Sequence, residues 1–66
     1  MRILGSDYIK DKERLTICIT DNINGIISLV HIEQIEDVIS LKQAEKLCKQ
    51  FSKRFNCDKI LEIDIK

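Results

Sequence analysis

The sequence has no proline, no tryptophan and only two glycines among its 66 residues. No apolar run approaches the roughly 20 residues that a membrane-spanning helix needs, so we expect no membrane span. The first residues also lack the apolar stretch and cleavage site of a secretory signal peptide. Eleven basic residues balance eleven acidic ones, so the whole chain has no net attraction to nucleic acid or to anionic lipid.

Cysteine is scarce and irregularly spaced. The three cysteines, Cys18, Cys48 and Cys57, form no CxxC pair. An odd number without such spacing predicts neither a disulfide framework nor a structural zinc site, and favours reduced thiols in the cytoplasm. No phosphate-binding, dinucleotide-binding, zinc-protease or serine-nucleophile motif occurs. We therefore expect no metal and no cofactor.

The length and composition indicate one small folded domain over residues 1–66. A chain this short rarely divides into two domains. Its hydrophobic content of 44% and charged content of 33% are typical of a folded protein and too apolar for disorder. Such a chain buries only roughly 60% of its unfolded surface, so its core alone is thin.

The clearest local signal is a hairpin. Asn24-Gly25 is the preferred pair for a two-residue turn in which both positions have positive φ. The resulting register places Ile19 opposite Val30 and Cys18 opposite His31, and a longer loop at residues 21–25 is the alternative. Alternation along the strands then defines two faces. Face A, the expected core face, collects Leu15, Ile17, Ile19, Ile23, Ile26, Val30 and Ile32. Face B collects Thr16, Cys18, Thr20, Asn22, Ile27, Leu29 and His31.

A helix follows the hairpin. Ser40 and Gln43 have the spacing of a capping box, and the spacing predicts a helix over 41–55 with Asn56 as a left-handed terminal residue. Its core stripe lies within an arc of about 120° and comprises Leu41, Ala44, Leu47, Cys48, Phe51 and Phe55.

Two weaker strands complete the expected fold. Residues 59–65 alternate as a strand does, and the first ten residues predict a strand bulged or interrupted at Gly5. A charged turn covers residues 11–13. The order β-β-β-α-β predicts an α+β domain with a mostly antiparallel sheet and one amphipathic helix packed on face A.

Lysines gather on the outer side of the expected helix. Lys42, Lys46, Lys49 and Lys53 fall within an arc of about 60°, and we call them the lysine ridge. Residues 40–56 carry five basic groups and one acidic group, a net charge of +4. The ridge is either a docking surface for phosphate or an acidic protein, or the charged outer face common to amphipathic helices.

Face B suggests a second surface. One helix covers only one face of a small sheet, which leaves Ile27 and Leu29 of face B without cover. Exposed apolar residues in a row indicate a partner, and symmetric self-association is the commonest arrangement. Isolated surface isoleucines are the alternative. We expect an oligomer or partner face that includes Ile27, Leu29, His31 and Cys18.

Catalytic pairs are weakly supported. Cys18 opposite His31 would form a thiolate nucleophile only if a third group oriented the imidazole, and none is evident. Glu62 and Asp64 share one face of the last strand, where charges usually serve solubility.

The sequence thus favours a non-enzymatic protein-binding module, such as an inhibitor, an adaptor or a regulatory subunit, acting as a homodimer. One specific form is a phage or mobile-element protein of the anti-CRISPR type, which inhibits a host nuclease or defence complex. The first alternative is nucleic-acid binding through the lysine ridge. The second is a cysteine-dependent enzyme that uses Cys18 and His31.

Overall fold

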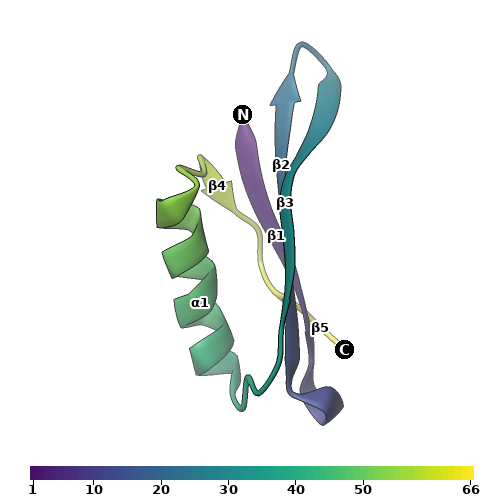
Figure 1. Cartoon of the computed structure of the whole chain (residues 1–66), viewed down its shortest axis with the longest axis vertical. Coiled ribbons are helices and arrows are strands. Elements are labelled where there is room, and N and C mark those ends of the chain that lie inside the picture. Colours follow the sequence, from purple (N-terminus) through teal and green to yellow (C-terminus); the bar gives the residue numbers. More distant parts are fainter.

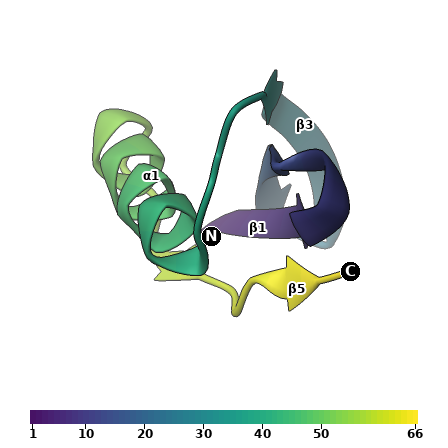
Figure 2. The ribbon, with the colours of Figure 1, turned by 90° about the horizontal axis from the view of Figure 1, so that it is seen from below.

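The computed structural model describes all residues 1–66, and it confirms the small α+β architecture with one helix on a mostly antiparallel sheet (Figure 1). The elements are β1 (Arg2–Ile9), a 3-10 turn (Lys10–Lys12), β2 (Arg14–Ile23), β3 (Ile26–Ile35), α1 (Leu41–Arg54), β4 (Lys59–Ile60) and β5 (Asp64–Ile65). Figure 2 shows α1 beside one face of the sheet, with no helix on the other face.

The sheet is a meander with a C-terminal addition. β1, β2 and β3 pair antiparallel in sequence order, whereas β4 and β5 both pair parallel with β1. The expected strand over 59–65 is therefore two short strands. β3 forms one edge of the sheet, and β2 is its only strand neighbour.

The predicted bulge or interruption at Gly5 is wrong. β1 pairs with β2 without a register shift from Arg2 to Ile9. A Cβ atom at Gly5 would lie 3.8 Å from Leu61 Cδ1, an ordinary van der Waals contact, so the C-terminal segment packs over this part of β1 without requiring a glycine there.

The helix begins as expected and ends one residue early. Ser40 Oγ accepts a hydrogen bond from the Gln43 N–H at 3.1 Å, and Gln43 Oε1 accepts one from the Ile39 N–H at 3.0 Å. These bonds satisfy N–H groups that have no partner within the helix. Asn56 has φ 54°, which confirms the left-handed residue after the helix.

The core lies between face A and α1. It consists of nine buried residues: Leu4, Tyr8, Leu15, Ile17, Ile19, Val38, Ala44, Cys48 and Phe51. Tyr8 crosses this core, and its hydroxyl donates to the Val38 carbonyl at 2.7 Å. Because a buried hydroxyl without a partner is costly, this bond fixes the segment that connects β3 to α1.

A bulge in β3 overturns part of the expected hairpin register. The pairs from Ile23–Ile26 to Thr20–Leu29 are as predicted, but the register then shifts and Ile19 pairs with His31. Val30 is the extra residue, and it packs against the core. Every residue of β3 after the bulge therefore lies on the opposite face from the predicted one.

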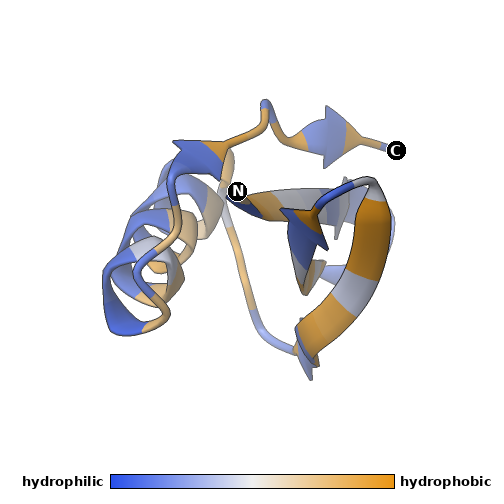
Figure 3. Ribbon diagram, turned by 90° about the horizontal axis from the view of Figure 1, so that it is seen from above, coloured by the Kyte–Doolittle hydropathy of each residue, from blue (hydrophilic) through white to orange (hydrophobic).

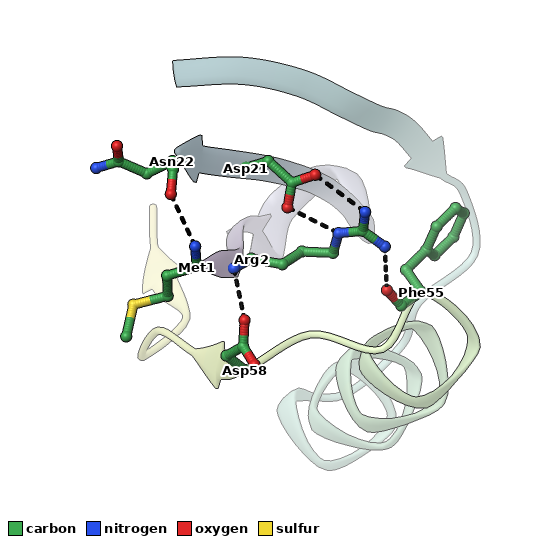
Figure 4. A network of polar contacts seen from close by, with 6 residues as sticks. All are labelled: Met1, Arg2, Asp21, Asn22, Phe55 and Asp58. Atoms are coloured by element: carbon green, nitrogen blue, oxygen red, sulfur yellow. Dashed lines mark hydrogen bonds and ion pairs between the residues drawn. The ribbon is translucent and has the colours of Figure 1, made fainter. Parts of the chain in front are cut away.

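The strand ends near the hairpin are tied together by Arg2 (Figure 4). Arg2 Nε and Nη2 donate to the two carboxylate oxygens of Asp21 at 2.8 and 2.9 Å, and Nη1 donates to the Phe55 carbonyl. The Arg2 N–H donates to Asp58 at 2.7 Å. One side chain thus joins β1 and β2 to the end of α1, where a helix favours positive charge.

Candidate interaction surfaces

The largest group of exposed apolar side chains lies on the β2–β3 hairpin. Five side chains there are each 58 to 70% exposed, and we call them the hairpin patch: Ile23, Ile26, Ile27, Leu29 and Ile32. Figure 3 shows hydrophobic colouring along the curved hairpin, whereas α1 is mostly hydrophilic. Ile23 and Ile26 lie on face A, whereas Ile27, Leu29 and Ile32 lie on face B, so apolar side chains are exposed on both sides of the hairpin. Exposed apolar surface marks interaction sites in soluble proteins.

Ile23 and Ile26 are exposed because the hairpin extends beyond α1 (Figure 1), whereas Ile27, Leu29 and Ile32 lie on the face that α1 does not cover. The chain leaves the helix at Phe55, whose carbonyl is bound by Arg2 beside Asp21. Ile23 and Ile26 lie past that point. The prediction that both belong to the core is therefore wrong, since no part of α1 reaches them.

The outer edge of β3 adds unpaired backbone groups to this apolar surface. An edge strand presents N–H and C=O groups that a further strand can bind. Many proteins protect such edges with lysine or proline. β3 contains neither, and Glu33 is its only acidic residue.

His31 lies on the helix side of the sheet, which corrects its expected place on face B. Its ring stacks on Phe55 with 4.7 Å between ring centroids, and on Phe51 with 6.1 Å. Its Nε2 lies 2.9 Å from Glu33 Oε1.

Cys18 remains on face B, where Ile32 lies opposite it. The expected Cys18–His31 pair is therefore wrong, because the bulge places the two side chains on opposite faces of the sheet. Ile32 takes the place that His31 was expected to have on face B. Ile27 and Leu29 are exposed on face B as expected.

The lysine ridge is exposed along its whole length. Lys42, Lys46, Lys49 and Lys53 make no ion pair, whereas Arg2, Arg14 and Lys66 are each paired with a carboxylate. Arg54 extends the positive surface toward the hairpin, with its guanidinium carbon 5.4 Å from the Phe55 ring centroid. Four unpaired ammonium groups can bind phosphate or carboxylate groups of a partner.

A groove of about 360 Å³ separates α1 from the C-terminal segment. Six of its nine lining residues are hydrophobic, among them Leu41, Ile60 and Ile63. Pockets that bind small molecules have such apolar walls and also a few convergent polar groups. Glu45, Lys49 and Glu62 supply charged groups at the rim, and all three are exposed.

Two thiols have raised pKa values. Burial raises the pKa of Cys48, whose Sγ donates to Ser6 Oγ at 3.4 Å. Burial likewise raises the pKa of Cys57, and the nearby Arg2 lowers it by a smaller amount. A raised pKa reduces the thiolate fraction and with it the nucleophilicity.

The acidic residues form no metal centre. No group of three or more His, Cys, Asp or Glu side chains is arranged to hold a metal ion. Asp64 lies 3.8 Å from Lys66, and Glu62 makes no ion pair. The one helix of the protein is too short and too polar to cross a membrane.

Comparison with protein-family models, with curated proteins and with solved structures finds no match for this chain. The surfaces therefore have to be interpreted from their own chemistry. Two parts of these surfaces were not predicted from the sequence, namely the open edge of β3 and the exposed side chain of Ile32. The high apolar content of residues 26–35 is the signal that points to both.

Proposed function

We propose that this protein is a non-enzymatic binding module that works by protein–protein contact. The observation that carries the proposal is the hairpin patch, five large apolar side chains exposed on one protruding hairpin. Apolar surface attracts a partner because each Å² removed from water contributes roughly 25 cal/mol. The open edge of β3 adds hydrogen-bonding groups to the same surface.

An inhibitor, an adaptor or a regulatory subunit fits this chemistry. A phage or mobile-element protein of the anti-CRISPR type, which blocks a host nuclease or defence complex, is the specific form that we favour. The positive lysine ridge on an otherwise acidic chain supports it, since an acidic surface on the target protein offers the opposite charge.

Capture experiments with matched variants test the proposal. The tagged full chain is incubated with extract of its source cells, beside Ile27→Lys/Leu29→Lys and the control Lys46→Glu/Lys49→Glu. We expect a defined protein, other than copies of this chain, that the wild type and the control retain and the hairpin variant loses. An identical set of captured proteins for all three baits would contradict a role for the hairpin patch.

The lysine ridge supports a second function, nucleic-acid binding. Its four ammonium groups are unpaired within the protein and lie along one side of α1. A ridge that neutralises phosphates gives a log–log salt slope of about −0.9 for each phosphate on duplex DNA. No aromatic side chain lies on that outer face, so stacking with single strands is not expected.

Titration against labelled duplex and single-stranded DNA and RNA across salt tests this second function. Binding should weaken steeply with salt and disappear in Lys46→Glu/Lys49→Glu. Lys10→Glu/Lys12→Glu is the matched control, because it removes the same charge from the exposed 3-10 turn. Absence of binding at low salt, or equal loss in both variants, would exclude the ridge as a specific nucleic-acid site.

A further inference from the structure

We propose that the hairpin patch binds a second copy of this chain, by antiparallel pairing of the two β3 edges about a two-fold axis at the Val30–His31 peptide. This inference rests on the proposed function and assigns the β3 edge of that surface to a second copy of the chain. The paired edges would join two sheets into one continuous sheet. The facing of the β3 side chains, the charge on the strand and the exposed area support it.

Along β3, the order of side chains on face A and face B is the same when it is read in either direction. Four positions lie opposite face B residues of β2: Ile27, Leu29, Ile32 and Gln34. The other positions lie opposite face A residues or, for Val30, pack on the core. Because the bulge places Val30 and His31 on the same side, the pattern is symmetric about the peptide that joins them.

In one register that symmetry matches the faces of all ten residues of β3. A two-fold axis at the Val30–His31 peptide places Leu29 of one copy opposite Ile32 of the other, and each pair of this kind occurs twice. Ile27 lies opposite Gln34, and Ile26 lies opposite Ile35, on matching faces. A shift by one residue would set face A side chains beside face B side chains, which sheets do not tolerate when one face is buried.

Charge is compatible with the same register. Glu33 is the only acidic residue of β3, and in the register it lies opposite Ser28 of the other copy. Like charges directly opposite each other destabilise strand pairs, and none occurs here. The apolar side chains of Leu29 and Ile32 would lie side by side on face B across the joined edges.

The exposed area is consistent with a missing partner. The chain has 4741 Å² of accessible surface, about 400 Å² more than the ~4,300 Å² expected for a folded monomer of its mass. The excess accords with the protruding hairpin, and a standard interface covers about 800 Å² on each partner. Only 10 of the 66 residues are buried, so pairing with a second copy would add buried surface that the single chain lacks.

Sedimentation equilibrium of the purified full chain, from micromolar to millimolar concentration, tests the association. We expect a species of twice the chain mass of 7.7 kDa. Leu29→Lys should raise the dissociation constant by about 30-fold or more, as expected for a central interface residue. Lys46→Glu/Lys49→Glu, which alters only the ridge, should leave it unchanged. Leu29 is exposed, so far-UV circular dichroism should show that its variant remains folded.

Disulfide trapping tests the register and does not depend on the Leu29→Lys variant. In a Cys18→Ser/Cys57→Ser background, Leu29→Cys/Ile32→Cys places the new cysteines directly opposite each other, with Cα atoms about 4.5–5.5 Å apart, which a disulfide can span. Oxidation should give a covalent dimer on a non-reducing gel. Ile27→Cys/Ile32→Cys is the control, since its thiols are diagonal, with Cβ atoms about 7 Å apart, too far for a disulfide.

Three results would overturn the inference. They are a monomer at all concentrations, a dimer that Leu29→Lys does not weaken, and efficient trapping of the control pair in place of the proposed pair. A monomer whose hairpin still captures another protein would reject the second copy and leave the proposed function standing. A dimer that captures no other protein would support the second copy and reject the proposed function.

Discussion

The imidazole of His31 stacks on the ring of Phe55 with 4.7 Å between the two ring centroids. This contact joins the bulged part of β3 to the end of α1. The ring of Phe51 stacks on both His31 and Phe55, so the three rings form one stacked group between the sheet and the helix. Stacked aromatic pairs contribute about 0.5–1.5 kcal/mol beyond the area that they bury.

The first prediction concerns this group. His31→Ala should lower the free energy of unfolding by about 1 kcal/mol, because the stacking on Phe55 is lost. His31→Phe keeps a ring in place and should retain most of the stability. Urea unfolding followed by circular dichroism measures both variants. Equal stability of the alanine variant and the wild type would show that the stacking is unimportant.

The second prediction is a pH dependence that arises from Asp21. The hydrogen bonds from Arg2 hold the pKa of Asp21 below its usual value of 3.8. A carboxylate whose pKa is lowered by folding stabilises the protein above its unfolded pKa, and this contribution is lost as the pH falls through the folded pKa. Asp21→Asn should therefore be less stable than the wild type at pH 7, and the difference should shrink below pH 3.8.

Thermal unfolding between pH 7 and pH 2.5 measures that difference. Asp11→Asn is the matched control, because Asp11 is exposed and makes no ion pair, and it should follow the wild type at every pH. A constant gap between Asp21→Asn and the wild type across the range would contradict the prediction.

The third prediction concerns the buried Tyr8 hydroxyl. Tyr8→Phe keeps the ring but removes the donor to the Val38 carbonyl. The buried carbonyl then has no partner, which costs about 1–3 kcal/mol. Guanidinium unfolding should show this loss with an unchanged m-value, since the exposed surface on unfolding is the same. A loss below 0.5 kcal/mol would mean that water or another donor replaces the hydroxyl.

The fourth prediction concerns thiol reactivity. Cys48 is only 2% exposed, and burial raises its pKa, so iodoacetamide should label it only when the protein unfolds. Cys18 is partly exposed and should react in the folded protein at a rate that His31→Ala leaves unchanged, because the two residues lie on opposite faces. Mass spectrometry of digested samples assigns the labelled sites. Slower labelling of Cys18 in His31→Ala would revive the cysteine–histidine pair.

The turn and the helix could be predicted because their signals are local. Asn24 and Gly25 have φ values of 53° and 80°, as a two-residue turn requires. Ser40 caps α1 through its own side chain. The bulge at Val30 could not be predicted in this way, because the contacts that accompany it, between His31 and the rings of Phe51 and Phe55, join residues that are not neighbours in the sequence.

The unpredicted bulge at Val30 therefore changed which side chains lie on face B. Strict alternation along β3 holds up to Leu29 and fails after Val30, so His31 and Ile32 exchange faces. The parallel pairing of β4 and β5 with β1 was also beyond sequence reasoning. Strands of two residues carry too little pattern, and their position depends on contacts such as the hydrogen bond from the Leu61 N–H to the Leu4 carbonyl at 2.8 Å. The lysine ridge could be predicted, since helical periodicity alone places its four residues together.

The position of β1 also has a consequence for the order of folding. Its antiparallel partner β2 follows directly in the chain, whereas the bond between Arg2 and Asp58 spans 56 residues. Contacts that close long loops form late, since their entropic cost precedes their gain. The three-stranded meander should therefore assemble before the C-terminal segment docks. The open edge of β3 would then be present on the nascent protein before its fold is complete.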